Sequence, residues 1–186
     1  MSHTALVIVD LQNDYFPAGK WPLVGIEQTA DNAASVLGWF REQSLPVVHV
    51  RHEFPSDEAP FFVPGSEGAR IHASMAPQES GSEAVILKNS VNAFLGTRLH
   101  EHLQEQGIER LVVVGAMSHM CIDAATRAAF DLGYGVTVLQ DACATHDQEF
   151  NGVTVPAAQV HAAFMAGLGF AYAEVTDTAA WLKQQG

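Results

Sequence analysis

Apolar residues along the chain follow two patterns that alternate. Short runs rich in Val, Ile and Leu stand between longer stretches whose apolar positions recur with helical spacing. Continuous apolar runs are typical of strands buried on both faces, and their alternation with helices is the pattern of βαβ units. The sequence therefore predicts six strands: Ala5–Val9, Pro46–Val50, Ala84–Leu87, Arg110–Val114, Gly135–Leu139 and Ala171–Val175.

The helical stretches lie between these runs. Gly107 and Gly133 follow two of them, and glycine is a common residue just past a helix end. The expected helices are Ile26–Gln43, Thr97–Gln106, Cys121–Leu132, Pro156–Leu168 and a short one at Thr178–Lys183. No repeat or low-complexity tract interrupts the series. The pattern predicts one α/β domain over residues 1–186, with three layers (α/β/α) and a Rossmann-like, six-stranded parallel sheet.

The segment from Arg51 to Ser82 has little periodicity and is rich in proline. Long irregular connections in compact domains are usually functional loops. This one follows the second strand, so it would leave the sheet at the strand C-termini, where open α/β sheets bind ligands. Its Phe54, Phe61 and Phe62 could line a pocket or pack the loop against the body, and the sequence leaves both open.

Composition narrows the classes of partner. The net charge is −12 with nine Lys and Arg, so the electrostatic attraction that drives binding to nucleic acid or anionic lipid is missing. The apolar runs are much shorter than the roughly 20 residues of a membrane helix. Two cysteines and no secretory leader favour a reducing compartment, so we expect a cytoplasmic protein with two free thiols and a small-molecule ligand.

Three residues of chemical interest stand at strand ends. Asp10 follows the first strand, Lys88 follows the third, and Cys121 lies a few residues beyond the fourth. Each has an ordinary structural explanation when taken singly: a turn residue, a solvated charge and a small buried side chain. Because the carboxyl ends of parallel strands meet at one edge, the three are expected to converge there.

Their chemistry is that of an activated nucleophile. A thiolate is the reactive form of cysteine, and a nearby cation, a helix N-terminus or a base can generate it. Ser118 is expected to cap the helix that holds Cys121 in its first turn, Lys88 to supply a positive charge, and Asp10 to act as general base.

Three segments carry a resemblance to a known family. They are Ala5–Phe16 (ALVIVDLQNDYF), Lys88–Phe94 (KNSVNAF) followed by Gly96-Thr97, and Leu111–Cys121 (LVVVGAMSHMC). They resemble, in order, the aspartate, lysine and nucleophile segments of the isochorismatase-like cysteine hydrolases, which include nicotinamidases and other small-amide hydrolases. The likeness continues at Ala124–Ala129, Gly133-Tyr134, Asp141-Ala142 and His161.

The resemblance implies the family's six-stranded sheet, with Asp10, Lys88 and Cys121 as a catalytic triad. No cofactor is expected. It also implies a cis peptide at Ala116-Met117, with inward-turned backbone N–H groups that form an oxyanion hole together with the N–H of Cys121. Members commonly form dimers or tetramers, so a homo-oligomer is expected. The implied reaction is hydrolysis of a small amide or related acyl compound through a thioester.

The sequence departs from the metal-binding members of that family. Those acting on nicotinamide hold a divalent metal with an Asp and a His two positions later, where this chain has His52 and Phe54. An aromatic ring cannot ligate zinc. His49, His52 and His72 could form a different site, but their spacing fits no standard motif, so no metal is predicted and His52 is a candidate substrate contact.

Cys121 also separates this chain from one branch of the family. True isochorismatases cleave a vinyl ether and lack the nucleophilic cysteine, so Cys121 favours acyl transfer, and carbamoyl or cyclic amide substrates stay open. Cys143 is expected to follow the fifth strand as a buried small residue. The sequence lacks the glycine-rich motifs of nucleotide-binding modules, which disfavours that function. The intact triad disfavours an inactive binding protein. Further pocket candidates flank the triad in sequence: Phe16, Trp21, Met117 and His119.

Overall fold

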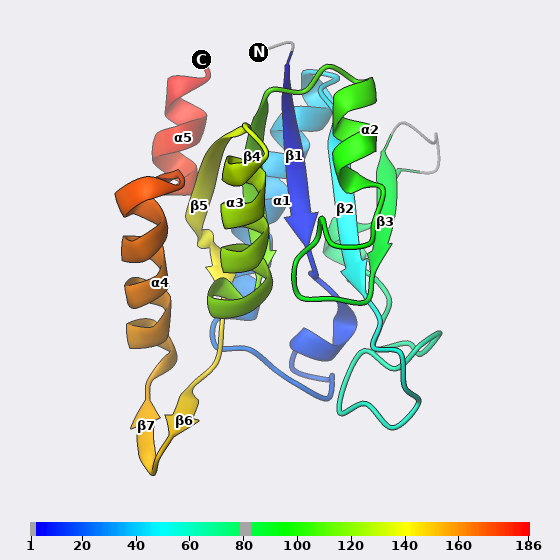
Figure 1. Cartoon of the computed structure of the whole chain (residues 1–186), viewed down its shortest axis with the longest axis vertical. Coiled ribbons are helices and arrows are strands. Elements are labelled where there is room, and N and C mark those ends of the chain that lie inside the picture. Colours follow the sequence, from blue (N-terminus) through cyan, green and yellow to red (C-terminus); the bar gives the residue numbers. More distant parts are fainter. Residues whose placement is uncertain (1–2, 79–82) are drawn as a thin grey trace.

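The computed structural model describes residues 3–78 and 83–186, and its centre is a six-stranded sheet (Figure 1). The strand order is β3-β2-β1-β4-β5-β8, and each neighbouring pair is parallel. The bounds are β1 Thr4–Val9, β2 Val47–His52, β3 Ala84–Lys88, β4 Arg110–Ala116, β5 Gly135–Ala144 and β8 Glu174–Thr176. This arrangement confirms the predicted fold class.

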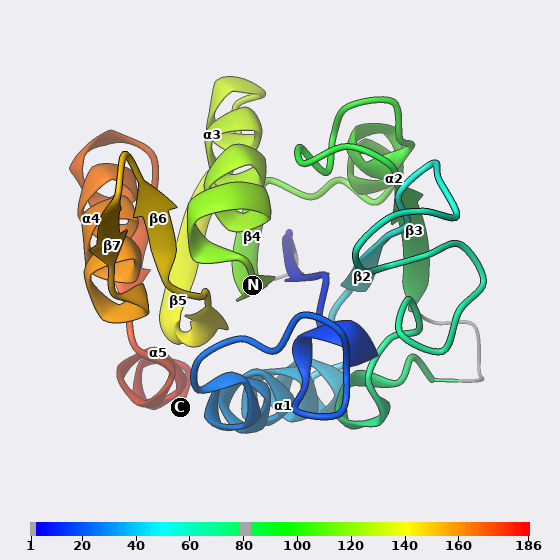
Figure 2. The ribbon, with the colours of Figure 1, turned by 90° about the horizontal axis from the view of Figure 1, so that it is seen from below.

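Helices cover both faces of the sheet (Figure 2). On one face lie α1 (Ile26–Glu42) and α5 (Thr178–Gln184), and on the other lie α2 (Leu99–Glu105), α3 (Asp123–Asp131) and α4 (Ala157–Ala171). Side chains of a strand point alternately to its two faces. Leu6 and Ile8 of β1 accordingly enter one core cluster and Ala5, Val7 and Val9 the other, which is why β1 is a continuous apolar run.

Two predicted boundaries at the C-terminal half were wrong. The expected strand Ala171–Val175 is shorter, because α4 continues to Ala171 and the edge strand β8 spans Glu174–Thr176. The fifth strand runs beyond Leu139 to Ala144 through a register shift against β4 between Val113 and Gly115. Cys143 therefore lies within β5, buried, rather than after it, and both cysteines are free thiols.

A short hairpin, β6 (Gln148–Phe150) and β7 (Val153–Val155), was not predicted. It projects from the body beside the N-terminal end of α4 (Figure 1). Its turn residues Asn151 and Gly152 have φ of 50° and 74°. Asn-Gly is a strong signal for a two-residue hairpin turn, so the sequence contained the evidence for this element.

The long connection after β2 is held by buried aromatic packing. It includes a 3₁₀ turn, η2 (Ala73–Met75), and its last residues, 79–82, lie outside the described part of the chain. Phe61 and Phe62 are 8% and 1% exposed and pack on Tyr15 of a second 3₁₀ turn, η1 (Asn13–Tyr15). Asp14 accepts a hydrogen bond from the N–H of Phe62 at 2.7 Å. Two of the three loop phenylalanines therefore pack the loop down.

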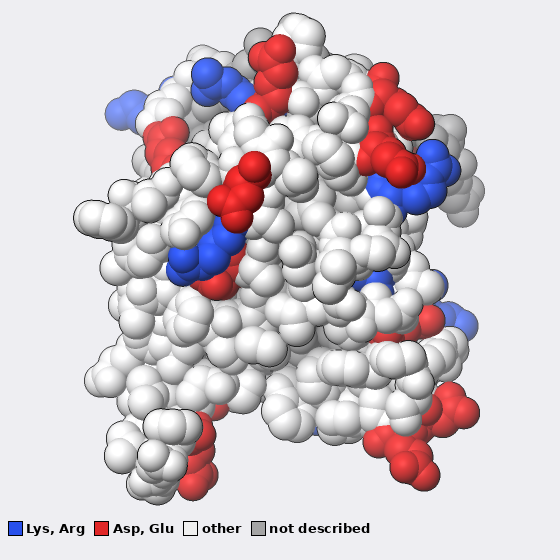
Figure 3. Space-filling model, in the orientation of Figure 1, with Lys and Arg blue, Asp and Glu red and all other residues white. Residues whose placement is uncertain are grey.

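White, uncharged residues make up most of the face shown in Figure 3. On the face shown in Figure 3, Lys and Arg do not gather into a single patch. Of the helices in the described residues, none is long and apolar enough to cross a membrane.

Glu83 joins α1 to the sheet immediately before β3. Its carboxylate accepts hydrogen bonds from Arg41 at 2.7 and 2.9 Å and from the N–H of Gln78 at 3.0 Å, and it lies 2.9 Å from His49 Nε2. Burial alone would raise the pKa of Glu83, but these partners outweigh it and lower the pKa to about 2. The ionised carboxylate is therefore part of the folded state.

We expect Glu83 to make stability depend on acidity. Because its pKa is lower in the folded state, its contribution is fully present above pH 4.5 and is lost as the pH falls toward 2. Chemical unfolding of Glu83→Gln should show a loss on the order of 2–3 kcal/mol at pH 6 that narrows steadily toward pH 3. A pH-independent loss would show that packing, and not charge, sets the contribution.

Candidate active site

Asp10, Lys88 and Cys121 converge at one edge of the sheet, as predicted. Lys88 is the last residue of β3, Asp10 directly follows β1, and Cys121 lies in a π-helical turn (Ser118–Ile122) between β4 and α3. The strand order places β3, β1 and β4 with only β2 inserted among them. The parallel topology thus brings together three residues that are far apart in the sequence. Asp10 and Lys88 are fully buried there, and Cys121 is 5% exposed.

The Lys88 ammonium is the centre of the group. Its Nζ lies 2.7 Å from Asp10 Oδ2, 2.7 Å from His52 Nδ1 and 3.3 Å from Cys121 Sγ. An ammonium has three N–H donors and no acceptor; hydrogen bonds to His52 and Cys121 use two of them, and Asp10 provides the counter-charge. Asp10, a His52 ring nitrogen and the Cys121 sulfur also lie within 4.8 Å of one another.

Burial sets the protonation states. Desolvation raises the pKa of Asp10 and exceeds the opposing effect of Lys88. Burial acts to lower the pKa of Lys88, but the charges of Asp10 and Cys121 raise it above its ordinary value. Burial, with the Asp10 charge added, raises the pKa of Cys121 well above that of a free thiol. Burial thus keeps the Cys121 thiol neutral and leaves Lys88 protonated, and it makes Asp10 a stronger base than an ordinary carboxylate.

The contact between Lys88 and Asp10 is close but poorly directed. Neither Asp10 oxygen has a partner in hydrogen-bonding geometry among the described residues. The pair is consequently held by charge, and the carboxylate has lone pairs free to take a proton.

The expected helix cap at Ser118 is wrong. Met117 precedes the π-helical turn, no side chain caps it, and α3 itself begins at Asp123. Ser118 is fully buried and its Oγ lies 2.8 Å from His161 Nδ1 of α4. Cys121 thus lies in the turn that leads into α3, rather than in the first turn of a helix capped by Ser118.

The chain reaches this turn through a close approach of β4 to β1. The Ala116-Met117 peptide bond is cis. Gly115, one residue earlier, has φ of 128°, and a Cβ placed there would collide with the carbonyl oxygen of Val9. Only glycine fits between the two strands at this point.

The remaining pocket candidates have different surroundings. His52 touches Lys88, and the half-buried Phe54 ring lies 4.4 Å from the His52 ring. Trp21 stacks on Phe61 with ring centroids 5.0 Å apart. The other three make these contacts: Phe62 packs on Tyr15, His119 Nδ1 lies 2.7 Å from Thr145 Oγ1, and Phe16 stacks on His72 beside a surface cavity of about 430 Å³. His52 and Phe54 are thus the candidates next to the triad.

Gln12 is a site residue that sequence reasoning passed over. Its side chain is fully buried and donates to the carbonyl oxygens of His52 at 2.8 Å and Ala69 at 2.7 Å. Its Oε1 accepts from the N–H of His52 at 2.7 Å. Gln12 therefore holds both the N–H and the carbonyl oxygen of His52. The sequence feature that could have identified Gln12 is its position two residues after Asp10, in the ALVIVDLQNDYF segment.

The donor set fits an internal cation better than a metal. Asp10, His52 and Cys121 are the group of potential ligands close enough together within the described residues, yet Lys88 Nζ already contacts all three. A transition metal needs ligands at about 2.0–2.3 Å and would have to displace that buried ammonium. His49 instead contacts Glu83, His72 contacts Ser74, and Phe54 offers no ligand atom.

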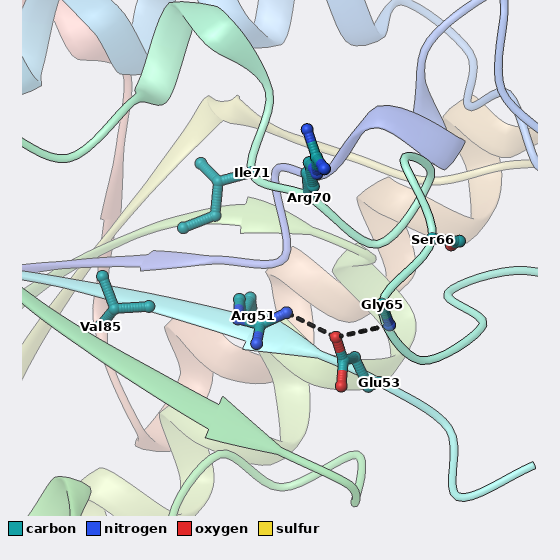
Figure 4. Close-up of a pocket in the computed structure, with 7 residues that line it drawn as sticks. All are labelled: Arg51, Glu53, Gly65, Ser66, Arg70, Ile71 and Val85. Atoms are coloured by element: carbon teal, nitrogen blue, oxygen red, sulfur yellow. Dashed lines mark hydrogen bonds and ion pairs between the residues drawn. The ribbon is translucent and has the colours of Figure 1, made fainter.

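A second cavity, of about 370 Å³, lies near β2 and β3 away from the triad (Figure 4). Its lining includes Arg51, Glu53 and Arg70. Arg51 and Glu53 form a 2.7 Å ion pair, and Arg70 pairs with Glu67 at 2.9 Å. The cations of this cavity are thus compensated, and it is no evident anion site.

Comparison with known proteins identifies similar chains. A model of the isochorismatase domain matches residues 4–180. The isochorismatase family protein YddQ of Bacillus subtilis, whose activity is uncharacterised, is 49% identical over 180 residues, covering 97% of this chain and 99% of that protein. Nicotinamidase 3 of Arabidopsis thaliana is 27% identical over 183 residues, covering 93% and 84%.

A solved structure extends the likeness to the fold. A protein from Oleispira antarctica, described as an isochorismatase hydrolase, superimposes with a TM-score of 0.94 at 58% identity. The match covers 98% of this chain and 97% of that one. The whole chain, and not a fragment of it, therefore shares this architecture.

Proposed function

The chain belongs to the isochorismatase family, and from this membership we propose that it hydrolyses a small amide through a thioester on Cys121. The observation that carries the proposal is the position of the Lys88 ammonium between a buried carboxylate and a buried thiol, 2.7 Å from Asp10 and 3.3 Å from Cys121. A thiol and a base joined through one cation can exchange a proton at little electrostatic cost. The arrangement suits covalent acyl transfer.

The first step is proton transfer from the thiol to the carboxylate. Before it, Lys88 faces an Asp10 anion and a neutral thiol, and after it Lys88 faces a neutral carboxyl and a Cys121 thiolate. The total charge of the group is unchanged. The raised pKa of Asp10 favours its acceptance of the proton, and Lys88 stabilises the thiolate that results.

The thiolate then attacks the amide carbonyl carbon. The new C–S bond sends the carbonyl electron pair to oxygen, and the backbone N–H groups of Met117 and Cys121 are proposed to bind that oxyanion. The turn leading into α3 also places the partial positive end of the helix near it. When the intermediate collapses, the C–N bond breaks and the protonated Asp10 gives its proton to the leaving nitrogen.

Water completes the cycle. Asp10, ionised again, takes a proton from water as the oxygen attacks the thioester carbon. The C–S bond then breaks, the acid leaves, and the proton held by Asp10 returns to the Cys121 sulfur. The substrate is a small molecule because the triad side chains are almost fully enclosed.

Amides are preferred over the other substrates of the family for a chemical reason. A buried thiol with a base has no role in vinyl-ether cleavage, whereas it is the requirement of acyl transfer. The similarity to a nicotinamidase supports this preference, but Phe54 offers no ligand atom for a metal, and the Lys88 ammonium already contacts Asp10, His52 and Cys121. Carbamoyl and cyclic amide compounds are the alternatives within the same chemistry.

The proposal is tested by trapping the intermediate. We expect that incubation with a panel of small amides and their esters, followed by acid quenching, adds the mass of one acyl group to the protein. Peptide mapping by mass spectrometry should place it on Cys121. An acyl adduct on another residue, or hydrolysis of vinyl ethers but of no member of the panel, would contradict the proposal.

Metal removal provides an independent check. Because Lys88 supplies the positive charge of the site, we expect hydrolysis to survive dialysis against a chelator with less than about a twofold loss, and added zinc to give no gain. Elemental analysis of the purified protein measures its metal content directly. Stoichiometric zinc, iron or manganese whose removal stops turnover would overturn the assignment of the cation to Lys88.

A further inference from the structure

His52 carries a buried hydrogen-bond donor that nothing in the described structure uses. The side chain is 4% exposed, and its Nε2 has no partner among the described residues. Leaving a buried polar group unpaired is destabilising. Such a group in a native protein calls for an explanation, and here it lies beside the proposed nucleophile.

The tautomer of His52 follows from Lys88. An ammonium only donates, so the 2.7 Å contact with Lys88 Nζ requires Nδ1 to accept and the proton to sit on Nε2. Burial, together with the charge of Lys88, lowers the pKa of His52 to about 4. The ring is therefore neutral at ordinary pH and offers one N–H.

The backbone of His52 is held in place from two directions. Gln12 bonds its N–H and its carbonyl oxygen, and His52 pairs in register with Lys88 across β2 and β3. A donor fixed in this way suits recognition, because little freedom is lost when a ligand binds.

His52 and Cys121 approach Lys88 from different elements. His52 ends β2, whereas Cys121 lies in the turn after β4, and both contact the Lys88 ammonium, at 2.7 Å and 3.3 Å. A carbonyl oxygen bound by the backbone N–H groups of the Cys121 turn already has donors of its own, so the Nε2–H of His52 is left for another acceptor on the same substrate. The half-buried Phe54 ring, 4.4 Å from the His52 ring, favours an uncharged group there.

We propose that the Nε2–H of neutral His52 donates a hydrogen bond to a second acceptor on the substrate, which is an uncharged small amide bearing a carbonyl oxygen or similar acceptor besides the scissile one. Resting on the proposed hydrolysis, this inference narrows its substrate class. Among the described residues of the site, the charge of Lys88 is balanced by Asp10, which disfavours an acidic substrate.

Two matched variants distinguish the role of the His52 Nδ1 acceptor from that of its Nε2 donor. In His52→Asn the amide lies where Nδ1 was, so it can still accept from Lys88, but the Nε2 donor is gone. In His52→Gln the amide nitrogen reaches the Nε2 position, so the donor is kept and the Nδ1 acceptor is lost. The probes are malonamide, which has a second carbonyl, and butyramide, which has an alkyl group in its place.

We expect the wild-type protein to prefer malonamide over butyramide in kcat/KM by about 10- to 100-fold, chiefly through KM. His52→Gln should keep most of this preference and His52→Asn should lose it. Nitrogen-15 NMR of labelled histidine should show an Nε2–H tautomer for the signal that both variants remove, with no titration between pH 5 and 8.

The outcomes are distinguishable. A signal for His52 with the proton on Nδ1, or one that titrates near pH 6.5, overturns the inference even if amides are hydrolysed. Equal losses on both probes in both variants would show a purely structural role and also overturn it. If no amide in the wider panel is hydrolysed or acylates the protein, the proposed function has failed, and the substrate assignment of His52 falls with it.

Discussion

Replacing Cys121 with alanine is expected to reduce kcat/KM for amide hydrolysis by about 10⁴-fold or more, because the proposed acyl intermediate forms on its sulfur. The fold should persist, since the exchange removes one atom from a site that is already tightly enclosed. Steady-state ammonia release and thermal unfolding together measure both effects.

The matched control is Cys143→Ala. Cys143 is buried in β5, and burial raises its pKa to about 12, so it should contribute packing and no chemistry. Its variant is expected to keep activity within about twofold and to keep the acyl adduct on Cys121. A Cys121→Ala protein that still hydrolyses amides at the wild-type rate, or a Cys143→Ala protein that does not, would show that the nucleophile has been misidentified.

Replacing Lys88 with methionine is expected to remove activity and stability together. Without the ammonium, Asp10 is a buried carboxylate with no counter-charge, and breaking a buried pair in this way costs about 3–5 kcal/mol. Loss of thiolate stabilisation should lower kcat by about 1000-fold. Both quantities are measured on one preparation by denaturant unfolding and an amide assay.

The pH dependence of this loss has a definite sign. Burial raises the pKa of Asp10 in the folded state, and removing Lys88 raises it further. A group of this kind contributes stability that is present at low pH and is lost as the pH rises through its folded pKa. The deficit of Lys88→Met should therefore be larger at pH 8 than at pH 5.

A double variant is the control for Lys88. Asp10→Asn with Lys88→Met removes both charges, so much of the lost stability should return while activity stays absent. A double variant as unstable as Lys88→Met would mean that Lys88 stabilises the fold by packing and not by its contact with Asp10.

The sheet and the convergence of the triad were predictable because both depend on patterns that are local in sequence. Continuous apolar runs such as Ala5–Val9 indicate buried strands, and parallel strands bring their carboxyl ends to one edge. Asp10, Lys88 and Cys121 each lie within a few residues of such an end. A prediction from strand position alone is therefore enough to bring them together.

The features that escaped prediction depend on distant contacts. Ser118 has the ordinary residue type and position of a helix cap, yet the π-helical turn directs it toward His161, 43 residues away. The role of Gln12 depends on residues 40 and 57 positions away. The contact of His52 with Lys88 depends on strand register. None of these can be read from a short window of sequence.

The close approach at Gly115 limits how this protein can change. A side chain there would strike the Val9 carbonyl, so β1 and β4 would have to separate. Asp10 follows the first of these strands, and the turn bearing Cys121 follows the second. A substitution at position 115 would therefore alter the spacing between Asp10 and Cys121. We therefore expect position 115 to stay glycine in variants with an altered substrate range, and such variants to differ in their loops.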